Sequence, residues 1–285
     1  MDENEIEERL KRILTPEFDR TMKQIYASSR ELAPDRSPGL RDDLRRKLQK
    51  AVDDLFDAFA HYRMSDPMSC CDHCVSPDEV RRLRSTPLRE LTHDDLWTIA
   101  TNIVLTMGDD RDYRYFLPRM IEGLTENALY DSEIVFSRLQ GIGFTNWPIG
   151  ERTALTDYLW AQFNADLSIE RSMRGIWAID TLLCCIGIAA LDADPFLSAW
   201  ASSNDEHAMQ NLVWYVSGEV SATDSLHLTN AFWSDGLVHS QILHWLQLPA
   251  TIALIERAYQ QYPLTGEEAV TFEENLRVLK SPGRP

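Results

Sequence analysis

Apolar residues recur at helical spacing along almost the whole chain of 285 residues, whereas strict alternation of apolar and polar residues is scarce. Helical spacing places apolar side chains on one face of a helix. The clearest stripe consists of Leu40, Leu44, Leu48, Val52, Leu55, Phe56 and Phe59. The 12 glycines and 13 prolines are too few for a chain of many short hairpins. The sequence therefore predicts an all-α protein of packed helical hairpins.

Residues that favour the first turn of a helix precede several expected helices. Ser76 is followed three positions later by Glu79, which is the spacing of a capping box, and a further start signal stands at Thr92-His93-Asp94-Asp95. We expect Gly108 to end the helix that begins after Thr92, because glycine is common just beyond a helix C-terminus. Other start signals stand at Thr15-Pro16, Ser37-Pro38 and Asp194-Pro195.

We expect three regions: an N-terminal helical region at 1–95, an acidic α-helical domain at 96–280 and a disordered tail at 281–285. In the second region, aromatic–leucine pairs recur at intervals of 42 and 38 residues, close to the ~40-residue unit of HEAT-like repeats. The pairs are Phe116-Leu117, Tyr158-Leu159 and Phe196-Leu197. Such pairs also recur by chance in leucine-rich chains, so a HEAT-like α-solenoid and an irregular helical domain both stay open.

The chain carries 28 Lys and Arg residues against 45 Asp and Glu residues, a formal net charge of −17. This charge repels phosphate backbones and anionic membrane surfaces, so neither nucleic acid nor a membrane is an expected partner. Residues 96–285 hold most of the excess, and no Lys or Arg stands between Arg174 and Arg257. The excess favours either a solvated acidic surface or a docking surface for a basic protein.

Aromatic residues are frequent in the stretch that lacks cations. Trp and Tyr often anchor protein interfaces, although a Trp in an apolar helical stripe packs in the core first. We expect one or two of these aromatic residues, with nearby acids, to bind the partner. The candidate partner-binding residues are Trp200, Asp205, Glu206, Trp214, Tyr215, Glu219, Asp224, Trp233 and Asp235.

The densest group of potential metal ligands is Cys70, Cys71, His73 and Cys74. Cys71 and Cys74 have the C-x-x-C spacing that lets two thiolates bind one Zn²⁺. The sequence lacks the second knuckle of an ordinary zinc module. Three interpretations stay open: a structural zinc site, a redox-active dithiol, and reduced cysteines that pack between the long N-terminal helix and the helix that begins after Ser76. The reduced cysteines are favoured.

The longest apolar stretch, residues 175–191, falls short of the ~20 residues that span a bilayer, and it contains Asp180. We expect a buried helix in which Asp180 pairs with Arg174 or Arg171 rather than acting as a catalytic acid. The charged N-terminus does not resemble a secretory signal. These features predict a cytoplasmic protein.

Few other residues suggest chemistry. Asp235 and His239 share a helical face, with His244 partly off it, and form a weak candidate for a metal or acid–base site. The common catalytic and nucleotide-binding motifs are absent from the sequence, which weakens the enzyme interpretation.

Two segments follow the Cys/His cluster: LRELTHDDL at Leu88–Leu96 and GDDRDYRYFLPR at Gly108–Arg119. This arrangement resembles a family of uncharacterised bacterial all-helical proteins in which a Cys/His cluster precedes the same motif pair. The resemblance covers residues 70–125 and implies no activity. The dense Arg and Asp residues of the pair favour either a buried ion-pair network or a recognition surface.

These features favour a non-catalytic, acidic, helical protein-binding protein. The specific hypothesis is a bacterial immunity or antitoxin-like inhibitor that covers the active site of a basic toxin domain of the nuclease or ADP-ribosyltransferase type. One alternative is an all-α zinc-dependent enzyme or regulator, with zinc as its cofactor. The other is a helical-repeat scaffold with several partners.

Overall fold

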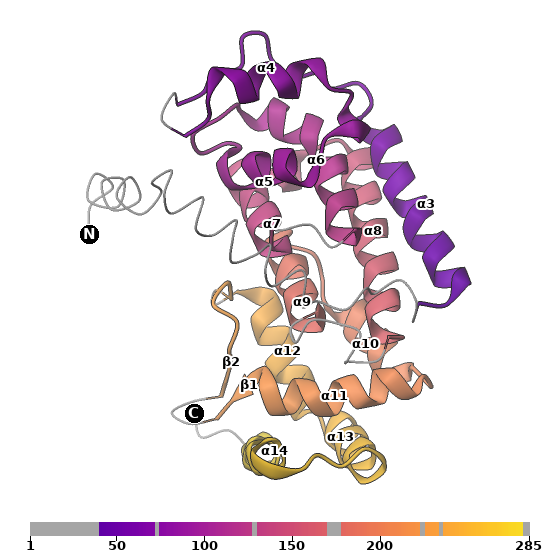
Figure 1. The fold of residues 1–285 in the computed structure, drawn as a ribbon. Coiled ribbons are helices and arrows are strands. Elements are labelled where there is room, and N and C mark those ends of the chain that lie inside the picture. The colour runs from indigo at the N-terminus through magenta and orange to yellow at the C-terminus, as the bar shows by residue number, and fades with distance from the viewer. Residues whose placement is uncertain are drawn as a thin grey trace, which may run out of the picture. The chain divides into compact units, whose positions relative to one another are not determined.

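The structure is a computed structural model that describes residues 40–71, 74–126, 130–169, 178–222, 226–233 and 236–281. These ranges contain twelve α-helices, two 3₁₀ helices and one sheet of two short strands (Figure 1), which confirms the all-α class. They divide into two compact units. Among the described residues, unit 1 comprises 52–138 and unit 2 comprises 40–51 and 139–281.

Unit 1 is built from helices that the apolar pattern indicates. Its elements are α3 (Asp42–Phe59), α4 (Pro77–Ser85), η1 (Leu88–Glu90), α5 (His93–Asn102), α6 (Asp110–Thr125) and α7 (Ser132–Gly141). The first residues of α3 and the last residues of α7 belong to unit 2. The expected domain boundary at residue 95 falls within α5, inside unit 1. The predicted capping box of Ser76 with Glu79 begins α4, and the start signal at Thr92 begins α5, where Thr92 forms a capping box with Asp95.

Gly108 does not end α5, and that prediction is wrong. The helix ends at Asn102, whereas Gly108 has φ of 63° and precedes Asp109, the N-cap of α6. A Cβ on Gly108 would lie 2.8 Å from the Cβ of Asp112 and 2.9 Å from Cδ1 of Ile103. The left-handed backbone and the lack of space both require glycine here.

Unit 2 contains the remaining helices and an antiparallel pair of strands in which Val220 lies opposite Leu228. Its elements are η2 (Phe144–Asn146), α8 (Ile149–Leu167), α9 (Ala178–Ile188), α10 (Asp194–Ser202), α11 (Glu206–Gly218), β1 (Val220–Ser221), β2 (His227–Leu228), α12 (Leu237–Gln247), α13 (Pro249–Gln261) and α14 (Gly266–Leu279). The apolar stretch of the sequence forms α9. Within the described ranges, no helix is both long enough and apolar enough to cross a membrane.

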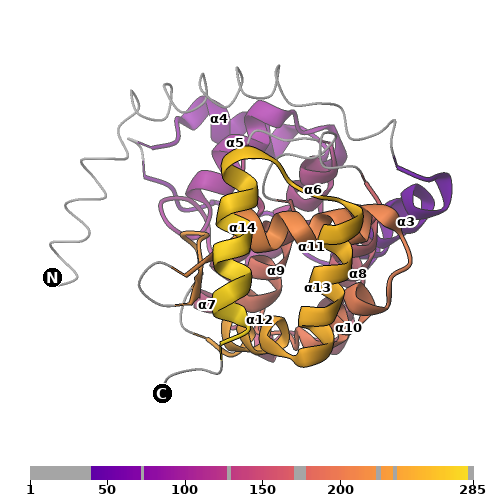
Figure 2. The same ribbon diagram turned by 90° about the horizontal axis from the view of Figure 1, so that it is seen from below.

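Helix α11 lies at the centre of unit 2. It contacts α8, α9, α13 and α14, and Figure 2 shows α13 and α14 crossing in front of it. Trp200 on α10 is buried, stacks on Trp245 with ring centroids 5.6 Å apart, and meets Tyr215 edge-on at 5.5 Å. In a solenoid, each helical pair contacts only its neighbours. The contact of α11 with α14 skips the pair α12–α13, so the HEAT-like solenoid is not confirmed.

A buried arginine organises the polar contacts of unit 1. Arg119 on α6 is 6% exposed. Its Nε and Nη2 donate hydrogen bonds to the carbonyl of Leu91 at 3.3 and 3.0 Å. Its Nη1 donates to Glu122 at 3.0 Å and to Glu126 at 2.9 Å. All three guanidinium nitrogens therefore meet acceptors, which offsets the desolvation of the charge.

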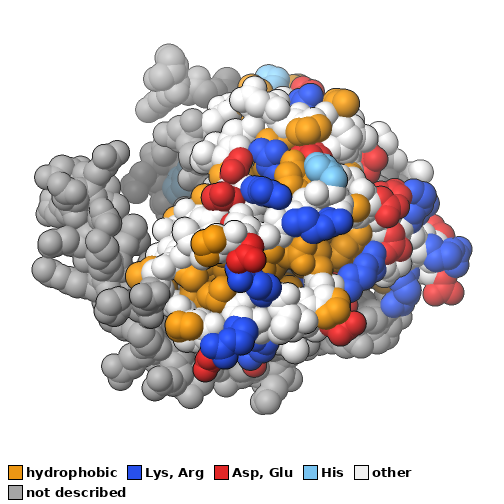
Figure 3. Space-filling view, turned by 90° about the horizontal axis from the view of Figure 1, so that it is seen from above, with side chains coloured by type: hydrophobic (Ala, Val, Ile, Leu, Met, Phe, Trp, Pro, Cys, Tyr) orange, Lys and Arg blue, Asp and Glu red, His pale blue; other side chains and the backbone are white. Residues whose placement is uncertain are grey.

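A second arginine extends this network toward α3. The guanidinium of Arg89 in η1 lies over the ring of Phe56, with Cζ 3.7 Å from the ring centroid. It pairs with Glu122 at 3.3 Å and with Asp53 at 2.8 Å. Elsewhere the charges of this unit are mixed, and Figure 3, seen from the α4 end, shows Lys and Arg side chains among Asp and Glu.

Replacing Arg119 with Met should destabilise the fold by about 3–5 kcal/mol, because it removes the charge that faces Glu122 and the donors to a buried carbonyl. Arg81→Met is the matched control, since Arg81 forms an exposed ion pair with Asp78 at 2.8 Å. That control should change stability by less than about 1 kcal/mol. Urea denaturation measures both variants, and equal losses would contradict a special contribution of the buried network.

The contribution of Glu126 should depend on pH. Burial raises its pKa, but the hydrogen bonds and charges of Arg119 and His93 together outweigh burial and leave the pKa lowered. A lowered folded-state pKa stabilises the fold above the unfolded pKa, and this contribution is lost as pH falls through the folded value. Glu126→Gln should therefore destabilise at pH 7, and its difference from the wild type should shrink as acidic pH falls through the folded pKa of Glu126. Thermal unfolding across this range measures it, and a constant difference would refute it.

Candidate functional site

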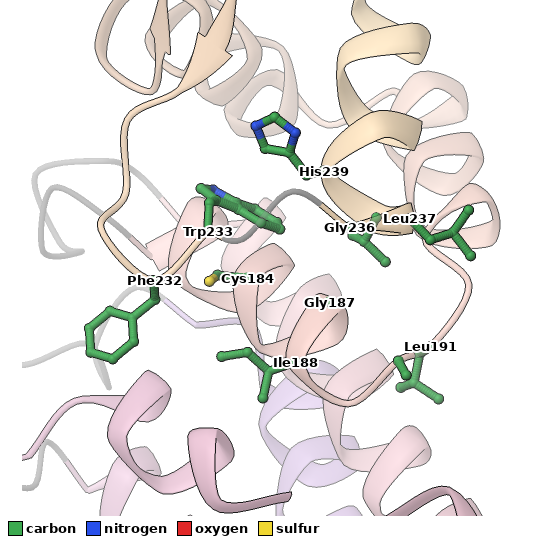
Figure 4. A pocket seen from close by; sticks show the side chains of 11 residues that line it. Cys184, Gly187, Ile188, Leu191, Phe232, Trp233, Gly236, Leu237 and His239 are labelled. Carbon is green, nitrogen blue, oxygen red and sulfur yellow. The ribbon is translucent and has the colours of Figure 1, made fainter. Parts of the chain in front are cut away.

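A small pocket in unit 2 opens between α9 and the beginning of α12 (Figure 4). Its volume is about 130 Å³. The lining comes from α9, the turn that follows it, the loop before α12 and α12 itself: Cys184, Gly187, Ile188, Ala190, Leu191, Phe232, Trp233, Gly236, Leu237, Val238 and His239. Most of these side chains are apolar, so the pocket favours an apolar occupant.

Two backbone features of α9 shape the pocket. A Cβ on Gly187 would lie 3.1 Å from Cζ3 of Trp233 and 3.4 Å from Cβ of Val238, so glycine lets both residues pack against the helix. Ala190, with φ of 52°, follows the helix end, where its N–H bonds to the carbonyl of Gly187 at 2.9 Å. The N–H of Leu191 bonds five residues back at 3.1 Å, which completes a Schellman ending. Alanine is strained in this left-handed conformation.

A buried carboxylate holds the wall that Trp233 forms. Asp180 on α9 is 1% exposed. Its Oδ1 accepts hydrogen bonds from Nε1 of Trp233 at 3.1 Å and from the hydroxyl of Tyr215 at 3.2 Å. Burial, followed by the charges of Asp180 and Glu219, raises the pKa of Tyr215 well above its usual range, so the phenol stays protonated and donates. These bonds join α9, α11 and the loop before α12.

The pocket contains one thiol, that of Cys184, and one imidazole, that of His239. The ring of His239 lies 5.9 Å from that of Trp233, centroid to centroid. In Figure 4 the Trp233 side chain lies between His239 and Cys184. The imidazole therefore packs against the indole that forms one wall of the pocket.

The mouth of the pocket is apolar and exposed. Phe232 is 42% exposed and Leu237 is 72% exposed. Asp192 and Asp194, both exposed, follow the turn that lines the pocket. Oδ1 of Asp192 accepts a hydrogen bond from Nε2 of Gln241 at 2.8 Å. This bond links the connection between α9 and α10 to α12, so the two segments beside the mouth are held together.

The candidate partner-binding residues differ widely in exposure. Trp200, Tyr215 and Glu219 are buried, so their side chains belong to the core of unit 2. Trp214, Trp233 and Asp205 are half-buried, and Glu206 is exposed. Asp205 caps α11 through the N–H of His207 at 3.0 Å and lies 3.7 Å from Arg41, a cation remote in the sequence. Asp224 and Asp235 lie outside the described residues.

The cysteine cluster lies in a turn of unit 1. The N–H of Cys71 donates to the carbonyl of Thr106 at 2.7 Å, and that of Cys74 donates to the carbonyl of Cys71 at 2.9 Å. Cys71 is exposed, Cys70 and Cys74 are half-buried, and His73 lies outside the described residues. Among the residues that are described, no three His, Cys, Asp or Glu side chains are grouped as metal ligands. A zinc site here stays a prediction.

The weak site of Asp235, His239 and His244 is not assembled within the described ranges. His239 lines the small pocket, whereas His244 lines a separate open groove of about 620 Å³ between the α12–α13 corner and the end of α14. Asp235 lies outside the described residues, as do both arginines expected to pair with the buried carboxylate of α9.

The sequence alone did not identify Phe232 and Leu237 as residues of the pocket mouth. The one feature that could have pointed to them is their place in or beside a connecting segment, outside the helical stripes. Exposed apolar residues that cluster in such a segment indicate an interaction site.

The motif pair of unit 1 supplies Arg89 and Arg119, the two arginines of the ion-pair network. Only Arg119 of these two is buried, and Arg89 is exposed, so the choice between a buried ion-pair network and a recognition surface stays a prediction. In comparisons with known proteins, no family model, no curated protein and no solved structure matches the chain. The resemblance of the motif pair therefore rests on its own residues.

Removing the hydroxyl of Tyr215 tests the contacts around Asp180. Tyr215→Phe should lower the free energy of unfolding by about 1–3 kcal/mol, because a buried carboxylate loses a donor. Tyr259→Phe is the matched control, since this hydroxyl donates to Glu273 at the surface and its loss should change stability by less than about 0.5 kcal/mol. Urea denaturation compares the two. A Tyr215→Phe variant as stable as the wild type would show that Asp180 does not need this bond.

Proposed function

We propose that the chain is a non-catalytic protein-binding protein that inhibits a basic partner, as an immunity or antitoxin protein covers the active site of a toxin domain. The observation that carries the proposal is the exposed apolar mouth of the pocket in unit 2, formed by Phe232 and Leu237. Exposed apolar groups bordered by charged residues are typical of protein interaction sites.

The charges beside the mouth suit a basic partner. Asp192 and Asp194 follow the pocket-lining turn and are exposed, and Glu206, at the beginning of α11, is exposed as well. The sequence from 175 to 256 contains no Lys or Arg. A negative potential of this kind accelerates association with a positively charged protein, and the acceleration weakens as salt rises.

The size of the pocket favours binding over catalysis. At about 130 Å³ it is smaller than the roughly 300–1,000 Å³ that holds most small-molecule ligands. One side chain of a protein fits this volume better than a whole metabolite does. The zinc-dependent enzyme and the helical-repeat scaffold are the alternatives that an experiment must separate from inhibition.

Affinity capture tests the proposal. The tagged chain, incubated with lysate of its source organism at low salt, should retain one basic protein in stoichiometric amount and release it as salt rises. The neutralised variant Asp192→Asn, Asp194→Asn and Glu206→Gln should retain at least tenfold less, because it removes exposed acidic charge from the stretch that lacks Lys and Arg while it keeps the hydrogen-bonding oxygens. Mass spectrometry identifies the retained protein, and an activity assay of that protein with and without the chain measures inhibition.

A matched variant removes the same charge elsewhere in unit 2: Glu267→Gln, Glu273→Gln and Glu274→Gln on α14. It should retain the partner nearly as well as the wild type. Equal retention by all three proteins, or no basic protein at all, would refute the proposal. Stoichiometric zinc in the purified chain would instead favour the metal-dependent alternative, and several weakly held proteins would favour the scaffold.

A further inference from the structure

We infer that the small pocket takes one aliphatic or aromatic side chain of the partner, from a segment that carries Lys or Arg on either side of it. This inference rests on the proposed function and deepens it, because it names the chemistry that the partner presents. It follows from the size, the walls, the rigidity and the surroundings of the pocket.

The volume of the pocket sets the size of its occupant. An apolar protein cavity of about 150 Å³ binds one benzene molecule. The pocket, at about 130 Å³, therefore holds a leucine-sized or phenyl-sized group. Ile188, Leu191 and Val238 line it with aliphatic carbon. The indole N–H of Trp233 is bonded to Asp180, so the wall that Trp233 offers to an occupant is carbon as well.

The walls are fixed before any partner arrives. The hydrogen bond to Asp180 holds the side chain of Trp233, which forms one wall. The hydrogen bond from Gln241 on α12 holds Asp192 and the connection between α9 and α10. A binding surface that is already ordered loses little conformational entropy when it binds, so one anchoring side chain contributes more affinity. Pockets of this kind are where interface hot spots are found.

The surroundings of the mouth select the residues next to the anchor. Phe232 and Leu237 are exposed, and a bound segment would cover both. Asp192 and Asp194 stand directly after the pocket-lining turn, in a stretch of sequence without Lys or Arg. A Lys or Arg beside the anchor meets attraction there, whereas an Asp or Glu meets repulsion.

Short peptides test the inference directly. The probe is a capped, fluorescein-labelled peptide with one central leucine, a glycine on each side and two lysines at each end, titrated against the full chain at low salt by fluorescence anisotropy. A peptide with central alanine should bind about tenfold to fiftyfold more weakly, because it buries about three fewer carbon groups. Replacing the lysines by glutamates should abolish binding.

Two positions of the protein provide a matched pair of variants. Leu237 is the first residue of α12 and 72% exposed, and Ile149 is the first residue of α8 and 70% exposed. Leu237→Ser should weaken binding of the leucine peptide several-fold and reduce the difference in affinity between the leucine and alanine peptides. Ile149→Ser should leave both peptides unchanged. Phe232→Ser gives a second variant at the mouth.

The outcomes separate the inference from the proposed function. Equal affinity for the leucine and alanine peptides, or no binding of either, overturns the inference, and the capture of a basic protein stands as a separate result. If the peptides discriminate as expected but no basic protein is captured and inhibited, the pocket is an anchor site and the inhibitory function is refuted. Loss of binding in Ile149→Ser as well would overturn the assignment to this pocket.

Discussion

The buried carboxylate of Asp180 is the constraint on which the site of unit 2 depends. A charge that is 1% exposed is costly unless donors surround it. Two of those donors, the indole of Trp233 and the phenol of Tyr215, come from different parts of the chain. Satisfying one acid therefore fixes a core helix and a loop relative to α9. The pocket is a consequence of this arrangement, since Trp233 is both a donor to Asp180 and a wall.

Unit 1 uses a buried charge of the opposite sign in a comparable way. Arg119 meets a backbone carbonyl and two carboxylates, and Glu122 links it to Arg89. The segments at Leu88–Leu96 and Gly108–Arg119, which are adjacent motifs in the sequence, thereby become one network. Each unit thus contains a polar centre whose central residue stands out in the sequence, whereas its partners, such as Tyr215 and Trp233 for Asp180, are brought together only by the fold.

The predictable part of the structure is the part that local physics decides. The stripe of α3, the capping box at Ser76 and the helix start at Thr92 depend on residues that are close in the sequence, and they were predicted. The role of Gly108 was not predicted, because a glycine in the left-handed conformation occurs both after the end of a helix and just before the N-cap of the next one. The pocket was missed for a different reason: it requires Gly187 to meet Trp233, 46 positions later in the sequence. No periodic signal marks such a contact.

The residues around the pocket differ in how freely they can be substituted during evolution, because some are held in the core and others are exposed. Asp180 and Tyr215 are buried and Trp233 is bonded to Asp180, whereas Phe232 is 42% exposed and Leu237 is 72% exposed. Substitutions at Phe232 and Leu237 would therefore cost the fold less than substitutions at the three hydrogen-bonded residues. Descendants of this chain would keep the hydrogen-bonded residues and diverge at the two exposed ones, so the rim of the pocket would change while its wall stayed the same.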